Sequence, residues 1–188
     1  ELQPGTASCL YGIDVLSTEV NWHPEVERPF YQAAANLGLG LAMHLGEDML
    51  DLATGLRLLD EGTRMMLDVQ RPHQADRPIR VGHVLACRVD VRGWYTRRKL
   101  AIVRLWEHVL DLVWLWDHAA QRDRRSVELI WSRVRGQLGS GFRSETLADL
   151  AQRYANHIPL CGCTGKCVQV TPPALHDVAH LVPPTCIG

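Results

Sequence analysis

The stretch LAIVRLWEHVLDLVWLWDH, residues 100–118, carries the strongest structural signal in the chain. Its apolar side chains recur at intervals of three and four residues, which is the spacing of a helix. Trp106 and Val113 fall on one side of such a helix, while Val109 and Trp116 fall on another. A helix that is apolar nearly all round is buried in a domain or an assembly. We therefore expect a central helix over about 81–120, kinked or divided at Gly93.

Helical periodicity continues outward from this segment in both directions. Thr171 and the two prolines after it are typical of a helix start, and Ser144 is a suitable N-cap for ETLADLAQRYA. The further helices that we expect cover about 8–20, 28–45, 47–69, 123–139, 145–155 and 171–182. One short extended piece, PIRV at 78–81, interrupts them. The predicted fold is all-α, an orthogonal bundle of about six or seven helices with a small cysteine-stapled C-terminal subdomain.

The charges are divided unequally along the chain. Residues 1–62 carry a net charge of −8 and residues 63–143 a net charge of +8, although all 188 residues sum to −1. The sign changes at the loop QRPHQADRP, 70–78, whose prolines and polar residues are typical of a connection. We therefore expect a helical domain over 1–143, with an acidic part (1–69) and a basic part (79–143), followed by a subdomain over 144–188.

Composition gives a broad class for the protein. Hydrophobic residues make up 46% of the chain and charged residues 22%, which is ordinary for a soluble globular protein. No apolar run reaches the roughly 18 residues of a membrane span, so we expect no membrane partner. The first residues, ELQPGTASCLYG, have neither the basic nor the apolar stretch of a signal peptide. This predicts a location in the cytoplasm of a host cell or in a virion, with secretion as the alternative.

Three of the six cysteines crowd into CGCTGKC at 161–167. Thiolates bind zinc tetrahedrally, and a short loop rich in glycine lets the backbone wrap around an ion. A closed structural site needs a fourth ligand, for which a fourth thiolate is our first choice. The predicted zinc ligands are Cys161, Cys163, Cys167 and Cys186. The alternatives for the fourth position are His157, His176 and His180.

The same cysteines also allow a disulfide interpretation. Six is an even number, and in a secreted chain Cys9 and Cys87 would pair while the C-terminal four form two bridges. A chain of this length needs no such bridges to build a stable core. Zinc is therefore favoured, with disulfides and free thiols as the alternatives.

The segment RVDVRGWYTRRKLAIVR, 88–104, sets cations beside aromatic rings. Arginine and lysine hold phosphates, and aromatic rings stack on bases. The predicted nucleic-acid contacts are Arg92, Trp94, Tyr95, Arg97, Arg98 and Lys99. The alternative is a basic helix face that is solvated, or that meets an acidic protein surface such as the acidic part of this chain.

Sequence motifs for catalysis are missing. The chain has no Walker loop, no G-x-G-x-x-G, no nucleophile elbow and no H-E-x-x-H. His83 and Cys87 are four residues apart and have the spacing of two metal ligands on a helix, but we expect a buried cysteine near a capping histidine. We therefore expect a binding protein rather than an enzyme.

Three strings, RPIRVGHVL, VRGWYTRRKLAIV and LWDHAAQRDRRSVELIWSRVRGQL, together with the final cysteines, resemble small helical proteins of actinobacterial phages and prophages. Those proteins are rich in arginine and end in a cysteine cluster of zinc-binding type. The resemblance spans about residues 78–167. It implies a zinc-stapled helical protein, and it implies no particular activity.

Three functions are consistent with these patterns. The first is a non-enzymatic, zinc-stapled binding or regulatory protein whose basic part contacts nucleic acid or an acidic partner. The second is a structural or assembly protein, of a virion for example, that forms homo-oligomers through the apolar helix between Trp106 and Trp116. The third is a secreted helical protein held by disulfides.

Overall fold

The computed structural model describes residues 11–15, 24–49, 51–73, 78–97, 105–137 and 144–155. The chain divides into two compact units, Glu1–Val89 and Asp90–Gly188. Each unit has a hydrophobic core of its own.

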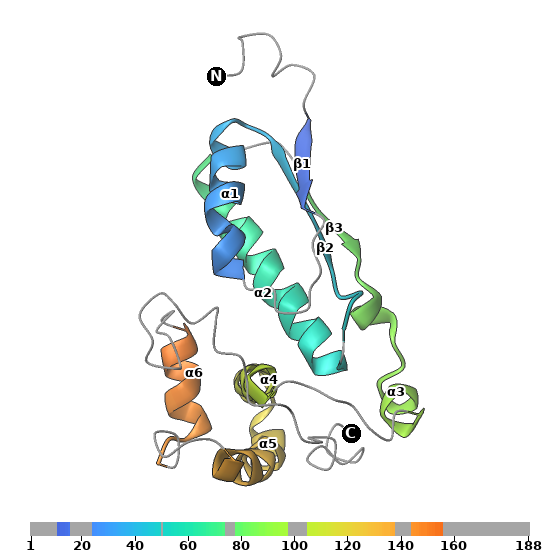
Figure 1. Ribbon diagram of the computed structural model, residues 1–188, viewed down its shortest axis with the longest axis vertical. Helices are drawn as coiled ribbons and strands as arrows, with labels where there is room; N and C mark the ends of the chain where they lie inside the picture. The colour runs from blue at the N-terminus through green and yellow to red at the C-terminus, as the bar shows by residue number, and fades with distance from the viewer. Residues whose placement is uncertain are drawn as a thin grey trace. The chain divides into compact units, whose positions relative to one another are not determined.

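Unit 1 is a three-stranded parallel sheet covered on one face by two helices (Figure 1). The strand order β1-β2-β3 follows the chain, and each connection between neighbouring strands contains one helix. Both helices lie on the same face, as expected when both crossovers have the usual right hand. The elements are β1 (Gly12–Val15), α1 (Pro24–Asn36), β2 (Gly40–Leu45), α2 (Leu52–Gln70) and β3 (Ile79–His83), with short 3-10 turns η2 (Arg71–His73) and η3 (Leu85–Arg88).

The alternation of side chains along β2 explains why this segment is a strand. Leu41, Met43 and Leu45 are buried against the helices, whereas Ala42 and His44 face the other way and are half-buried. A period of two is the signature of a strand with one buried face. On α1, the buried Tyr31 donates its hydroxyl hydrogen to the carbonyl of Ala42 at 2.9 Å, which ties this helix to the middle strand.

The prediction of an all-α fold is confirmed for the helical majority of the described residues and is wrong for unit 1, which contains the parallel sheet. The helix expected over 28–45 ends at Asn36, because Gly38 has a φ of +69°. The amides of Gly38 and Leu39 bond to the carbonyls of Ala35 and Ala34, which is a Schellman motif. The chain then reverses into β2.

Other expected elements of unit 1 change as well. The segment 8–20, predicted as a helix, contains strand β1 in its described part. The helix expected over 47–69 begins at Leu52 and ends at Gln70. The extended piece PIRV is confirmed and grows into β3.

Unit 2 consists of helices in its described part, as the sequence predicts. Val109, Leu112 and Val113 are almost fully buried, which confirms the apolar central helix over its second half. They pack with apolar residues of the two helices that follow, among them Trp131 and Leu150. The elements are α3 (Val91–Arg97), α4 (Leu105–His118), α5 (Gln121–Val134), the 3-10 turn η4 (Arg135–Gln137) and α6 (Leu147–Ala155). The expected start of the central helix at 81 is wrong, because β3 and η3 occupy the chain up to Arg88, and Gly93 lies inside α3 rather than at a break.

The start of α6 is two residues later than Ser144 predicts. The Thr146 hydroxyl oxygen accepts from the amide of Asp149 at 3.1 Å, and the Asp149 carboxylate accepts from the amide of Thr146 at 3.0 Å and from its hydroxyl at 2.7 Å. This reciprocal pair is a capping box. Thr146 therefore caps the helix, and Ser144 is exposed.

The predicted zinc ligands Cys161, Cys163, Cys167 and Cys186, with the alternatives His157, His176 and His180, lie outside the described residues. The zinc site, the disulfides and the C-terminal helix therefore stay predictions. Among the helices that the structure describes, none is both long enough and apolar enough to cross a membrane.

Candidate metal centre

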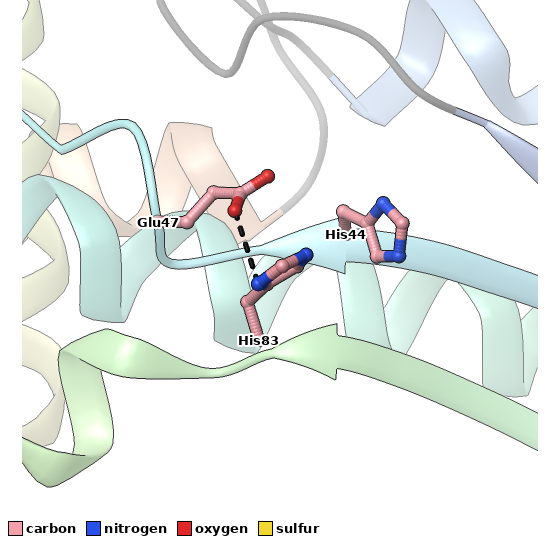
Figure 2. A group of neighbouring side chains, drawn as sticks. All are labelled: His44, Glu47 and His83. Atoms are coloured by element: carbon pink, nitrogen blue, oxygen red, sulfur yellow. Dashed lines mark ion pairs between the residues drawn. The ribbon is translucent and has the colours of Figure 1, made fainter.

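Two histidines and a glutamate meet at the carboxyl edge of the sheet in unit 1 (Figure 2). His44 is the penultimate residue of β2, and Glu47 stands in the loop that follows this strand. His83 is the last residue of β3, which pairs with β2. Parallel strands end at the same edge of a sheet, and ligands of open α/β sheets bind at that edge.

The backbone at the ends of the two strands has an unusual conformation that brings these side chains together. Gly46 has a φ of +74°, and its carbonyl accepts the amide of Ala86 at 2.9 Å, which joins the two loops. His83 and Val84 have φ values of +62° and +52°. This left-handed region is disfavoured for residues with a side chain, and most of all for a β-branched residue such as Val84. Strained residues of this kind concentrate at functional sites.

One of the distances in the group matches the spacing of ligands around a small ion. Nδ1 of His83 lies 3.2 Å from Oε2 of Glu47, and the rings of His44 and His83 meet edge to face with their centroids 4.7 Å apart. One ligand atom from each of the three residues lies within 4.8 Å of the other two. Ligands around a tetrahedral zinc ion are about 3.4 Å apart, given zinc–nitrogen bonds of about 2.1 Å. The Glu47–His83 pair already has this spacing, and His44 has to approach it more closely.

Solvent reaches this group, which we call the His44–Glu47–His83 cluster. The His83 side chain is 47% exposed, Glu47 is 32% exposed and His44 is 25% exposed. A catalytic metal needs such access, because water or substrate must occupy the ligand position that the protein leaves open.

Of the three residues, the sequence singled out only His83, and it paired this histidine with Cys87 instead of His44 and Glu47. His83 ends a strand and Cys87 lies in η3, so the two do not share a helix. Cys87 is exposed, and the expectation of a buried cysteine is therefore wrong. The missed signal is a histidine near the end of an alternating segment, a glutamate three residues later, and a histidine at the end of the next extended piece.

Four of the six predicted nucleic-acid contacts belong to α3. Arg92 and Arg97 are exposed, and Trp94 is half-buried. The two arginines are five residues apart, which places them about 140° apart around a helix. Tyr95 is described only in its backbone, and Arg98 and Lys99 lie outside the described residues. The structure therefore brings no group of these cations together in its described part, and the nucleic-acid interface stays a prediction.

A buried histidine is the other polar feature that stands out, in unit 2. His108 on α4 is only 4% exposed, and its Nε2 has no hydrogen-bond partner among the described residues. Burial lowers the pKa of His108, and the nearby Asp111 carboxylate partly opposes this effect. This histidine is therefore a neutral residue of the core.

No protein-family model matches the chain, and no curated protein matches it either.

Proposed function

We propose that unit 1 binds a divalent transition-metal ion through the His44–Glu47–His83 cluster and uses it to activate water for hydrolysis. The observation that carries the proposal is the convergence of two imidazoles and one carboxylate at the carboxyl edge of a parallel sheet. The two histidines come from strands that are separate in sequence and adjacent in the sheet, and Glu47 comes from the loop after the first of them.

The chemistry of the donors favours zinc or a similar ion. Imidazole nitrogen suits zinc, copper, iron and nickel, whereas calcium and magnesium prefer ligand sets made of oxygen. Two histidines with one glutamate form one of the usual ligand sets of catalytic zinc. Zinc is therefore the first ion to test.

The number of ligands favours catalysis over a structural role. Structural zinc has four protein ligands, while three protein ligands leave one position for water. Zinc lowers the pKa of a bound water to about 7, which supplies hydroxide at neutral pH, and it polarises a carbonyl or phosphoryl oxygen. An ion held by His44, Glu47 and His83 would supply hydroxide for the hydrolysis of an ester or amide: the oxygen of the water would bond to the carbon or phosphorus, the bond to the alcohol or amine would break, and the leaving group would depart with a proton.

Glu47 fits two roles in such a site. At 3.2 Å from His83 it is placed to be the third ligand, and a carboxylate next to bound water also serves as the general base. The substitution Glu47→Gln separates the two roles. Loss of metal binding identifies a ligand, whereas retained binding with lost turnover identifies a base.

The test has to separate this site from the cysteines near the C-terminus. Cobalt(II) replaces zinc and absorbs visible light, and thiolate ligands add intense charge-transfer bands in the near ultraviolet. Cobalt bound to the His44–Glu47–His83 cluster should give visible bands without thiolate charge transfer. We expect His44→Gln to remove these bands and Cys161→Ser to leave them in place. His118→Gln is the matched control, because His118 is an exposed histidine of unit 2.

Activity is tested with chromogenic carboxylic esters, amides and phosphate esters. We expect hydrolysis of at least one class, its loss with a chelator, and its return when zinc is added. Cobalt bands that are the same in His44→Gln and in the unsubstituted chain would refute the site. Bound metal without hydrolysis of any class would restrict the proposal to metal binding.

A further inference from the structure

We infer that Asp14 is a positioning residue that orients His44 for the metal, in a role that rests on the function proposed above. Asp14 belongs to β1, a strand that contributes no residue to the His44–Glu47–His83 cluster. The inference extends the site across all three strands of the sheet. It concerns the tautomer and the orientation of one imidazole ring.

The pairing of strands puts Asp14 beside His44. Asp14 is in register with Ala42 of β2, and His44 follows two residues later on the same face of that strand. The Asp14 Oδ2 atom lies 3.6 Å from Nε2 of His44, which is within ion-pair range of a protonated imidazole and slightly longer than a hydrogen bond, so the carboxylate has to move closer to accept the proton on Nε2. This face is the one opposite the two helices, since the helix-facing residues of β2 are Leu41, Met43 and Leu45.

Gly82 supports the ring from the other side. His44 is in register with Gly82 of β3. A Cβ atom at position 82 would lie only 2.0 Å from Cδ2 of His44 and 2.6 Å from its Nε2. The ring therefore rests directly on the backbone of β3, a place that is open only because residue 82 has no side chain.

Three neighbours consequently fix the His44 ring. The carboxylate of Asp14 lies towards Nε2, the glycine lies under the ring, and the ring of His83 meets it edge to face. A carboxylate beside one nitrogen of an imidazole holds the proton on that nitrogen and leaves the lone pair of the other nitrogen for a metal. Asp14 thus selects the tautomer with the proton on Nε2, and Nδ1 becomes the ligand atom.

The first test needs no metal. Long-range ¹H–¹⁵N correlation spectra report which nitrogen of a neutral histidine carries the proton. We expect His44 to be protonated on Nε2 in the metal-free chain, and we expect Asp14→Asn to shift the population towards the Nδ1 tautomer. An unchanged tautomer in Asp14→Asn, or a proton on Nδ1 in the unsubstituted chain, would overturn the inference.

The second test measures zinc affinity by competition with a chromophoric chelator. Loss of a carboxylate that orients a metal-bound histidine typically weakens metal binding 10- to 100-fold, and we expect Asp14→Asn to do so by about this factor. Asp14→Glu should restore part of the affinity. Asp68→Asn is the matched control, because Asp68 is an exposed carboxylate of unit 1 that pairs with Arg71.

The outcomes separate this inference from the proposed function. An unsubstituted chain that binds no zinc would refute the metal site, while the tautomer would still test the Asp14–His44 pair. A chain that binds zinc with equal affinity in Asp14→Asn would keep the metal site and refute the role of Asp14. Gly82→Ala is expected to weaken zinc binding at least as strongly, with circular dichroism to verify that unit 1 is folded.

Discussion

His108 shows how one residue links burial to pH. A histidine whose pKa is lowered in the folded state remains neutral there, while the same group in the unfolded chain takes up a proton below about pH 6.5. Above that pH the histidine is neutral in both states, so the folded state keeps its full stability at this position. This stability declines as the pH falls, because the unfolded state then binds more protons than the folded state.

We predict that His108→Gln flattens the loss of unfolding free energy between pH 8 and pH 5.5. Glutamine is neutral at both pH values, so the proton uptake of the unfolded chain at this position disappears. Urea titrations at the two pH values measure the effect. An unchanged loss of unfolding free energy in His108→Gln would contradict this account of the buried histidine.

Helix α2 contains a charged pair that is almost fully buried. The Arg57 side chain is 2% exposed, and its Nη1 atom lies 3.2 Å from Oε1 of Glu61, which is 12% exposed. Taking charges out of water is costly, and the attraction between them offsets the cost only while both are present. Removing one partner is therefore worse than replacing both charged residues by apolar ones.

We predict that Glu61→Ala destabilises unit 1 by about 3 kcal/mol, because it leaves a buried guanidinium without this carboxylate. The double variant Arg57→Met/Glu61→Leu should cost less than half as much, since apolar side chains fill the space and leave no charge to desolvate. Chemical unfolding monitored by far-ultraviolet circular dichroism measures both. Equal losses in the two variants would contradict this account of the pair.

The capping box of α6 gives a second prediction for a helix. Thr146→Ala removes the side chain that caps the first turn, and we expect a loss of about 1 kcal/mol in unfolding free energy. Ser144→Ala should have little effect, because Ser144 is exposed and lies outside the capping box. A larger loss of unfolding free energy in Ser144→Ala than in Thr146→Ala would show that Ser144 is the N-cap.

The capping box of α6 also loses stability in acid. The hydrogen bonds from Thr146 lower the pKa of the Asp149 carboxyl. A depressed carboxyl pKa contributes stability above the unfolded value of 3.8, and this contribution is lost as the pH falls through the folded value. The difference in unfolding free energy between Thr146→Ala and the unsubstituted chain should therefore shrink when unfolding is measured below the folded-state pKa of Asp149.

Sequence periodicity was sufficient to predict the secondary structure where a helix packs against other helices. It was insufficient where helices alternate with strands. The apolar positions of α4 repeat without interruption, so its existence and its burial could be predicted. Segment 28–45 contains two patterns, a helical one up to Asn36 and an alternating one from Leu39, and the first was extended over the second. Gly38 marks the boundary between the two patterns.

The cluster could not be predicted without the pairing of the strands. Histidine, glutamate and histidine in the order of the chain suggest nothing until β2 and β3 are known to be parallel neighbours. The residue that makes room for His44 is a glycine, whose importance depends on a contact across strands. Side-chain chemistry was visible in the sequence, and its spatial arrangement was not.

At the scale of the whole molecule, each unit has its own core, so metal binding should stabilise unit 1 in particular. A ligand that binds only the folded state at a free concentration 100 times its Kd stabilises it by about 2.7 kcal/mol. We predict a shift of about this size for unit 1 on addition of zinc. Hydrogen exchange resolved by residue measures it, with amides of β2 and α2 rising in protection.

His44→Gln should abolish this zinc-dependent protection of unit 1 and leave the core amides of α4 and α5 unchanged. Protection that rises equally in both units would point to an ion held elsewhere in the chain. Protection that persists in His44→Gln would contradict the site at the carboxyl edge.

The parallel order of the three strands also has a consequence for synthesis on the ribosome. Neighbouring parallel strands can pair only after the whole connection between them has been made, so loop closure precedes the contacts that offset its cost. β3 is the last strand of the sheet, and His83 is its last residue. The metal ligands therefore come together only when the third strand joins, which makes ion capture a late marker that unit 1 has completed its folding.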